Sequence, residues 1–221
     1  MNFKRVLALS PHTDDAELGA GGTINRLLEE GSEVHYIAFS APLPELQEEC
    51  HQALKMLRAK DNEIHITILD YPRREFPSHR QEILQTLYDY KQKFNPDLIF
   101  TPCTYDVHQD HQVVTSEVIR CFKNATVFGY ILRWNCQTIK EDVIIPIEEH
   151  HLQAKIAATS QYFSQFKRRR SYFSPDYHRF EAYVRGIDLP SHYAEAFELI
   201  HLSIPNTAAD FATDSDTEGN P

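Results

Sequence analysis

Three side chains that could bind a metal or move a proton stand together near the N-terminus. His12, Asp14 and Asp15 follow directly after a short apolar run at residues 6–9. Such a run predicts a buried strand that gives way to a helix at this point. Ligands of open α/β sheets bind at the carboxyl ends of strands, so these residues stand where a site would form. The alternative is that Asp15 only caps the following helix.

A second fragment, at residues 106–111, carries His108, Asp110 and His111. The two histidines are three residues apart, so they share a face if they lie on the first turn of a helix. Two imidazoles and one carboxylate leave coordination positions open, which suits catalytic zinc. Both histidines could instead be surface residues of an ordinary turn. The sequence therefore predicts a metal site if the two fragments meet.

The adjacent carboxylates of Asp14 and Asp15 cannot both reach one ion without strain. The simplest arrangement is that one of them binds the metal and the other acts as a general base. A metal lowers the pKa of its bound water to ~7, and a nearby carboxylate can accept the proton. A free imidazolium on the opposite side could stabilise the oxyanion or protonate the leaving group. This set of residues is typical of a metal-dependent hydrolase.

The hydrophobic pattern predicts which elements position these fragments. Strands are expected at 6–9, 33–39, 63–69, 98–100 and 126–132, with a weaker one at 143–145, and helices at 16–30, 43–59, 78–93 and 109–123. This alternation predicts an α/β protein with a mostly parallel sheet and helices on both faces. The glycines between 19 and 22 lack the spacing of a phosphate loop, so close packing of the first helix explains them better. From 148 onward the pattern is helical.

Composition narrows the class of protein. The chain has 221 residues and a net charge of −10, which predicts a single domain over 1–205 and an acidic, disordered tail over 206–221. The acidic balance argues against nucleic acid as a partner. No apolar run approaches the ~20 residues of a membrane span, and no signal-peptide core follows the N-terminus. We therefore expect a cytoplasmic protein with a small-molecule substrate.

Basic residues could supply substrate contacts. Arg73 and Arg74 follow the third expected strand near the same sheet edge, and either could bind a sugar hydroxyl or an anionic group. The alternative is a surface ion pair with Glu75 or Glu82. The dense run at 167–170 could receive a phosphate, although a solvated helix face is the simpler interpretation.

Both fragments resemble a known family. Pro11-His12-Thr13-Asp14-Asp15-Ala16-Glu17, followed by glycines, resembles the His-Pro-Asp-Asp-Glu signature of the PIG-L, or LmbE-like, N-acetylglucosaminyl deacetylases. His108-Gln109-Asp110-His111 resembles the family's His-Pro-Asp-His motif. Weaker similarities follow at Lys155, 160–161, 185–186 and 193–197, so the resemblance runs from about 4 to 204. Thr13, Ala16 and Gln109 depart from the family pattern, but every ligand and base type is kept.

The resemblance implies a role for each residue of the first fragment. His12 and Asp15, together with His111, would hold Zn²⁺, with Fe²⁺ or another divalent metal as alternatives. Asp14 would be the general base. The implied fold is Rossmann-like, and the implied reaction removes acetate from an N-acetylglucosamine-containing conjugate. Related proteins often form trimers or hexamers, so a homo-oligomer is possible here.

The second fragment would complete the machinery. The resemblance implies that His108 stabilises the oxyanion or donates a proton, and that Asp110 orients and charges His108. The alternatives are another N-acyl substrate or an inactive sugar- or metal-binding module, against which the extra carboxylate of Asp14 argues. A remote alternative is a non-haem iron oxygenase, which uses two histidines and one carboxylate. Such enzymes typically use a β-barrel and His-x-Asp spacing, whereas this chain has His-x-x-Asp.

Overall fold

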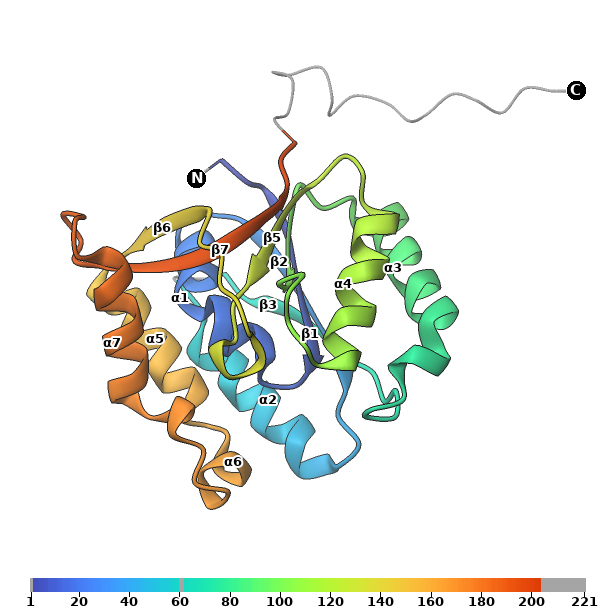
Figure 1. Cartoon of the computed structure of the whole chain (residues 1–221), viewed down its shortest axis with the longest axis horizontal. Coiled ribbons are helices and arrows are strands. Elements are labelled where there is room, and N and C mark those ends of the chain that lie inside the picture. The colour runs from blue at the N-terminus through green and yellow to red at the C-terminus, as the bar shows by residue number, and fades with distance from the viewer. Residues whose placement is uncertain (1, 60–61, 204–221) are drawn as a thin grey trace, which may run out of the picture.

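A seven-stranded sheet in the order β3-β2-β1-β4-β5-β7-β6 forms the centre of the protein (Figure 1). The structure is a computed structural model, and it describes residues 2–59 and 62–203. The five parallel strands are β1 (Arg5–His12), β2 (Glu33–Ser40), β3 (Ile64–Ile68), β4 (Leu98–Pro102) and β5 (Thr126–Tyr130). The mostly parallel sheet expected from the sequence is confirmed. The expected tail at 206–221 lies outside the described residues.

The last strand of the sheet was not expected. β6 (Val143–Ile147) matches the weak strand expected at 143–145, but β7 (Tyr193–His201) runs antiparallel between β5 and β6. The expectation of helix from 148 onward is therefore wrong for this segment. Its buried glutamates, Glu195 and Glu198, interrupt the apolar alternation that marks a strand. Their partners, Lys155 and Thr104, are distant in the sequence.

Helices cover both faces of the sheet, as expected. One core packs α1 (Asp15–Glu29), α2 (Pro44–Met56) and α5 (Glu149–Thr159) against the sheet. The other core packs α3 (Arg80–Phe94) and α4 (Gln109–Cys121) against the opposite face (Figure 1). The short helix α6 (Phe163–Lys167) and the helix α7 (Pro175–Gly186) follow α5 in the chain.

Glycines let α1 lie unusually close to the sheet. A Cβ atom on Gly19 would lie 2.5 Å from the Tyr130 ring, and one on Gly22 would lie 2.7 Å from Ile147. Both distances are far shorter than an ordinary carbon–carbon contact. Close packing therefore explains these glycines, as expected, and it holds the start of α1 at the carboxyl edge of the sheet.

The strand order reverses between β1 and β4. The chain adds β2 and β3 on one side of β1, then adds β4 and β5 on the other. In open α/β sheets this reversal opens a crevice beyond the strand ends, where ligands bind. The loop after β1 and the loop after β4 both border this crevice. They carry the two fragments that the sequence singles out.

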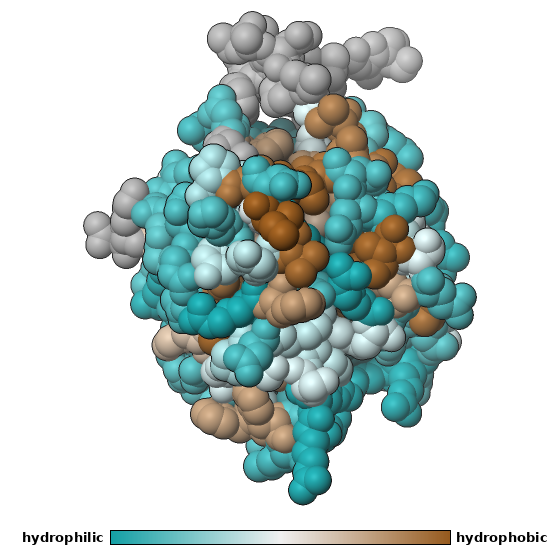
Figure 2. Space-filling view, turned by 60° about the vertical axis from the view of Figure 1, so that its left-hand side comes forward, coloured by the Kyte–Doolittle hydropathy of each residue, from teal (hydrophilic) through white to brown (hydrophobic). Residues whose placement is uncertain are grey.

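The side of the molecule that carries α5 and α7 is mainly hydrophilic, with hydrophobic side chains gathered in separate patches (Figure 2). Among the exposed hydrophobic residues, α7 contributes Phe180, Tyr183 and Val184, and Ile187 follows directly after this helix. Within the described ranges no helix is both long and apolar enough to cross a membrane.

Candidate active site

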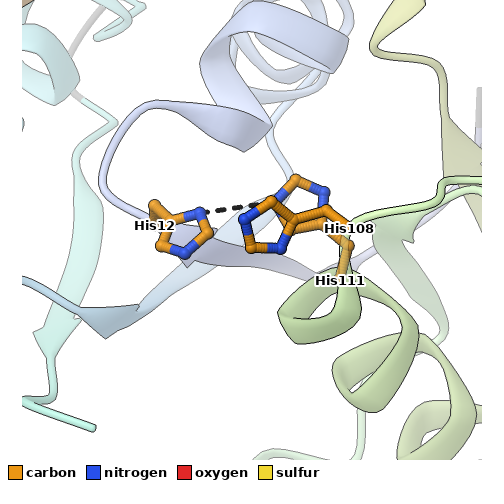
Figure 3. A group of neighbouring side chains, drawn as sticks. All are labelled: His12, His108 and His111. Carbon is orange, nitrogen blue, oxygen red and sulfur yellow. Dashed lines mark hydrogen bonds between the residues drawn. The ribbon is translucent and has the colours of Figure 1, made fainter. Parts of the chain in front are cut away.

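The two fragments meet at the crevice between β1 and β4. His12 closes β1, Asp15 begins α1, and His111 lies in the first turn of α4. The rings of His12 and His111 point toward one another, with His108 beside them (Figure 3). All three residues of the predicted ligand set are at least nine-tenths buried. The juxtaposition predicted from the sequence is therefore confirmed.

Three donor atoms stand at nearly equal distances from one another. His12 Nδ1 and Asp15 Oδ2 are 3.1 Å apart, Asp15 Oδ2 and His111 Nε2 are 3.2 Å apart, and the two ring nitrogens are 3.3 Å apart. Three donors at ~2.0–2.1 Å from a tetrahedrally coordinated zinc ion lie ~3.3 Å from one another. The triangle of donor atoms therefore fits one face of a zinc coordination sphere. His12, His108 and His111 also form a group whose ligand atoms all lie within 4.8 Å of one another.

Buried carboxylates hold the far side of both rings. His12 Nε2 contacts Asp110 Oδ2 at 3.1 Å, and His111 Nδ1 contacts Asp106 Oδ2 at 2.7 Å. Both carboxylates are fully buried. These contacts leave His12 Nδ1 and His111 Nε2 to face Asp15. A carboxylate in this position fixes the tautomer of a metal-binding imidazole and raises its basicity.

Asp110 occupies a different place from the one the resemblance implies. Its carboxylate contacts His12 and accepts from the backbone N–H of Arg74 at 2.7 Å. It meets His108 only through its backbone N–H, which donates to His108 Nδ1 at 3.2 Å. Side chains two positions apart at the start of a helix do not face each other, and the Asp110 carboxylate lies against His12 instead.

Electrostatics sets Asp14 apart from its neighbour. Burial and the charge of Asp15 raise the pKa of Asp14 to about 6, although His12, Arg170 and Arg73 act in the opposite direction. The pKa of Asp15 is held well below its usual range, because its two histidine neighbours outweigh its burial. A carboxyl group with a pKa near neutral can accept and release protons at working pH. The two adjacent carboxyl groups therefore differ in their pKa, while the division into one ligand and one base stays a prediction.

The loop that carries Asp14 is anchored through its backbone. The carbonyl oxygen of Thr13 accepts hydrogen bonds from the hydroxyls of Tyr36, at 3.2 Å, and Tyr162. The same hydroxyls lie within hydrogen-bond distance of the carboxyl of Glu17, which is fully buried, and burial raises the pKa of Glu17 to about 8. Glu17 therefore acts as a packing partner of the loop and does not face the metal-binding atoms.

His108 has a free nitrogen for substrate. It caps α4, and its Nδ1 accepts a backbone hydrogen bond, so the neutral ring carries its proton on Nε2. Burial and the charges of His111 and His12 lower the pKa of His108. The ring stacks on His111 with the centroids 4.6 Å apart, and it lines the same cavity as Asp14. It is thus placed to donate a hydrogen bond into that cavity.

The cavity outside the histidines has a volume of about 190 Å³. Of the two arginines predicted to bind substrate, Arg73 lines it, whereas Arg74 does not and contributes backbone contacts to Asp110 and Gln109. From the basic run, Arg170 lines the cavity, while the other three side chains are exposed. The expectation of a solvated face is therefore correct for residues 167–169 only.

Sequence reasoning missed several residues of the site. Asp106 was included in the second fragment but given no role, although its spacing of five residues from His111 was a usable signal. Gln165, Asn135, Ser40 and Tyr172 line the cavity from segments far apart in the chain. No local motif marks these four.

Comparison with known proteins decides the family. The family model for GlcNAc-PI de-N-acetylase, named PIG-L, matches residues 7–122, more than half of the chain. This chain belongs to the PIG-L family. The matched region includes both histidine fragments and four of the five parallel strands, from the third residue of β1 to the end of β4, while β5 lies beyond it.

Similarity to individual PIG-L proteins and folds is more distant. The diacetylchitobiose deacetylase of Thermococcus kodakarensis is 27% identical over 171 residues, and the alignment covers 69% of this chain and 59% of that protein. The chain thus matches less than two thirds of that relative's length. A conserved protein of Thermus thermophilus has the same fold, with a TM-score of 0.72, 22% identity, and coverage of 91% and 96%. So does the 4-carboxy-2-hydroxymuconate hydratase of Pseudomonas putida, with a TM-score of 0.71, 18% identity, and coverage of 93% and 100%. The fold alone therefore does not specify deacetylation.

Proposed function

We propose that this protein is a metal-dependent hydrolase that removes the acetyl group from an N-acetylglucosamine-containing conjugate. The observation that carries the proposal is the triangle of His12, Asp15 and His111. Beside it lies the carboxyl group of Asp14, whose pKa is raised to about 6. Membership of a de-N-acetylase family and the similarity to a diacetylchitobiose deacetylase support it. The shared fold with a hydratase makes a direct activity test necessary.

His12, Asp15 and His111 would hold Zn²⁺, or Fe²⁺ or another divalent ion, with Asp110 and Asp106 fixing the two rings. When bound, the ion polarises the amide carbonyl and makes water more acidic. The donor set of two nitrogens and one oxygen leaves room for substrate and water, as catalytic zinc sites do. His108 is an alternative third nitrogen ligand by distance. Its Nδ1 accepts a backbone hydrogen bond, so the proton of the neutral ring lies on Nε2 and neither nitrogen has a free lone pair for the ion. Asp15 contacts both of the other rings, and we therefore assign the ligand position to Asp15.

Asp14 would accept the proton of the attacking water and pass it to the leaving nitrogen. The cavity position of its carboxyl and its raised pKa suit that work. His108 would stabilise the negative charge that develops on the carbonyl oxygen, since its Nε2–H is the free donor of the ring. Arg73 would contact the substrate outside the acetyl group. We assign no side-chain contact to Arg74, although the sequence predicts one.

Acetate release from N,N′-diacetylchitobiose and N-acetylglucosamine tests the proposal. We expect turnover that stops on chelation and returns with added Zn²⁺. Asp14→Asn should lower kcat by ~10²–10⁴-fold, the usual worth of a general base. Asp188→Asn, which removes an exposed carboxylate that does not line the cavity, is the matched control. Full activity of Asp14→Asn, or turnover unaffected by chelator, would contradict the mechanism.

We also propose that residues 1–205 act as one deacetylase domain, because both cores pack on the same sheet. Its partner would be a small amino-sugar conjugate. Three properties stay predictions: the cytoplasmic location, the absence of a nucleic-acid partner and the trimeric or hexameric state. Sedimentation of the purified chain would measure the oligomeric state.

A further inference from the structure

Two arginines that are distant in the sequence line one cavity. Arg73 lies in the loop after β3, and Arg170 directly precedes a short 3₁₀ helix at Ser171–Phe173. The guanidinium of Arg170 lies 5.8 Å from the centre of the Tyr172 ring, a distance at which cation and ring attract. Tyr172 in turn stacks on Trp134, with the ring centroids 3.6 Å apart. The aromatic pair therefore helps to hold Arg170 at the cavity.

Neither guanidinium makes a carboxylate contact within 4.0 Å in the described part of the chain, although both act on the charge of Asp14 from a greater distance. This is notable because the protein carries 32 acidic residues against 22 basic ones. Seven other arginines make carboxylate contacts within 4.0 Å, namely Arg26, Arg58, Arg80, Arg120, Arg133, Arg179 and Arg185. Arg168 and Arg169 also have no such contact, but they are exposed and do not line the cavity. Among the described residues, Arg73 and Arg170 are the arginines that line the cavity, and both lack a carboxylate contact within 4.0 Å.

The cavity is also lined by buried polar atoms that form no hydrogen bond in the described part of the chain. Gln165 Oε1 and Ser40 Oγ are buried and accept or donate no hydrogen bond among the described residues. Both side chains line the cavity and are at most 6% exposed. A buried polar atom without a partner costs ~1–3 kcal/mol, so a ligand that supplies the missing partner gains affinity. Sugar hydroxyls can both donate and accept, and they suit these two atoms.

We propose, on the basis of the deacetylase function proposed above, that the substrate is an anionic amino-sugar conjugate whose phosphate or carboxylate group is bound by Arg73 and Arg170. Guanidinium groups bind both kinds of anion through paired N–H donors, which makes arginine the usual residue for this task. Two such groups on one small cavity favour an anion over a neutral second sugar. Gln165 and Ser40 would bind hydroxyls of the same ligand.

Binding of the deacetylated compounds tests the anion site without catalysis. Calorimetry would compare glucosamine 1-phosphate with glucosamine on the full chain. We expect the phosphate to bind at least ~10-fold more tightly, and we expect Arg73→Gln and Arg170→Gln each to remove most of that difference. Arg168→Gln is the matched control, because it removes one exposed arginine of the same basic run. Equal binding of the two compounds, or an equal loss in Arg168→Gln, would overturn the proposal.

Turnover then separates the anion site from the deacetylase function. N-acetylglucosamine 1-phosphate, N-acetylmuramic acid and N,N′-diacetylchitobiose supply a phosphate, a carboxylate and a neutral group. A higher kcat/KM for the phosphate assigns a phosphate substrate, and a higher value for the carboxylate assigns a carboxylate one. Fastest turnover of the neutral sugar overturns the anion site but leaves deacetylation standing. Tight, Arg73-dependent binding of glucosamine 1-phosphate with no acetate release from any compound supports the anion site and refutes deacetylation.

Discussion

Asp106→Asn tests whether the carboxylate behind His111 prepares the metal-binding nitrogen. Asp106 is fully buried, and its Oδ2 lies 2.7 Å from His111 Nδ1. Its Oδ1 accepts from the backbone N–H of His108 at 2.8 Å. Because both oxygens accept, an asparagine must turn its NH₂ group toward one of these donors. The substitution therefore keeps the shape of the residue and removes its charge and one acceptor.

Two magnitudes follow from these contacts. Loss of a carboxylate that orients a metal-binding histidine typically weakens metal affinity ~10–100-fold, which corresponds to ~1.4–2.7 kcal/mol. The mismatched donor should also cost the fold ~1–3 kcal/mol in free energy of unfolding. The loss of stability alone would be expected at any buried polar site. The loss of metal affinity is specific to the arrangement around His111.

Zinc affinity, measured by competition with a chromogenic chelator, separates the two effects. Glu198→Gln is the matched control, since Glu198 is a buried carboxylate that binds Thr104 through both oxygens. We expect both variants to lower the melting temperature, but only Asp106→Asn to weaken zinc binding. Unchanged zinc affinity in a folded Asp106→Asn protein, or an equal loss in Glu198→Gln, would refute the reasoning.

Three further predictions concern stability. Gly19→Ala should lower the free energy of unfolding by ~1–3 kcal/mol, because its methyl group would overlap the Tyr130 ring; denaturant unfolding measures this, and a neutral effect would contradict the close packing of α1. Lys155→Met should cost ~3–5 kcal/mol by leaving buried Glu195 without its cation at 2.5 Å, and a Lys155→Met, Glu195→Leu double variant should recover part of the loss. Burial and the charge of Lys155 lower the pKa of His178 to about 3, so the unfolded chain binds the extra proton and stability falls as pH drops below ~6.5, by ~2 kcal/mol at pH 5. His178→Gln should show a correspondingly smaller loss between pH 7.5 and pH 5, and an unchanged pH dependence would disprove this origin.

The sequence alone was sufficient for the parts of the site that stand next to the ends of parallel strands. His12 and Asp15 follow a strand, and His111 follows another, so the topology of a parallel sheet is enough to bring them to one edge. The same logic predicted the parallel strands and the helices on both faces. Spacing within a helix also placed His108 and His111 side by side. Local pattern and one rule of sheet topology explain these successes.

Other features depend on contacts between distant segments, which a single sequence does not reveal. β7 was missed because Glu195 is buried by pairing with Lys155, forty positions earlier. Gln165 and Arg170 reach the cavity through short elements without a repeating pattern. Asp110 carries a family motif, yet its contact with His12 across 98 positions is visible only in three dimensions.

The departures from the family signature affect side chains that do not touch the metal-binding atoms. Thr13 accepts hydrogen bonds from two tyrosine hydroxyls through its carbonyl oxygen, an acceptor that a proline at this position would also provide. Gln109, which stands in place of the usual proline, donates from Nε2 to the carbonyl oxygen of Arg74. A proline side chain has no donor and could not make this contact, although the first helical position would accept it. Gln109 thus joins the second fragment to the loop that carries Arg73, and this departure from the motif connects the proposed metal site to the arginine side of the cavity.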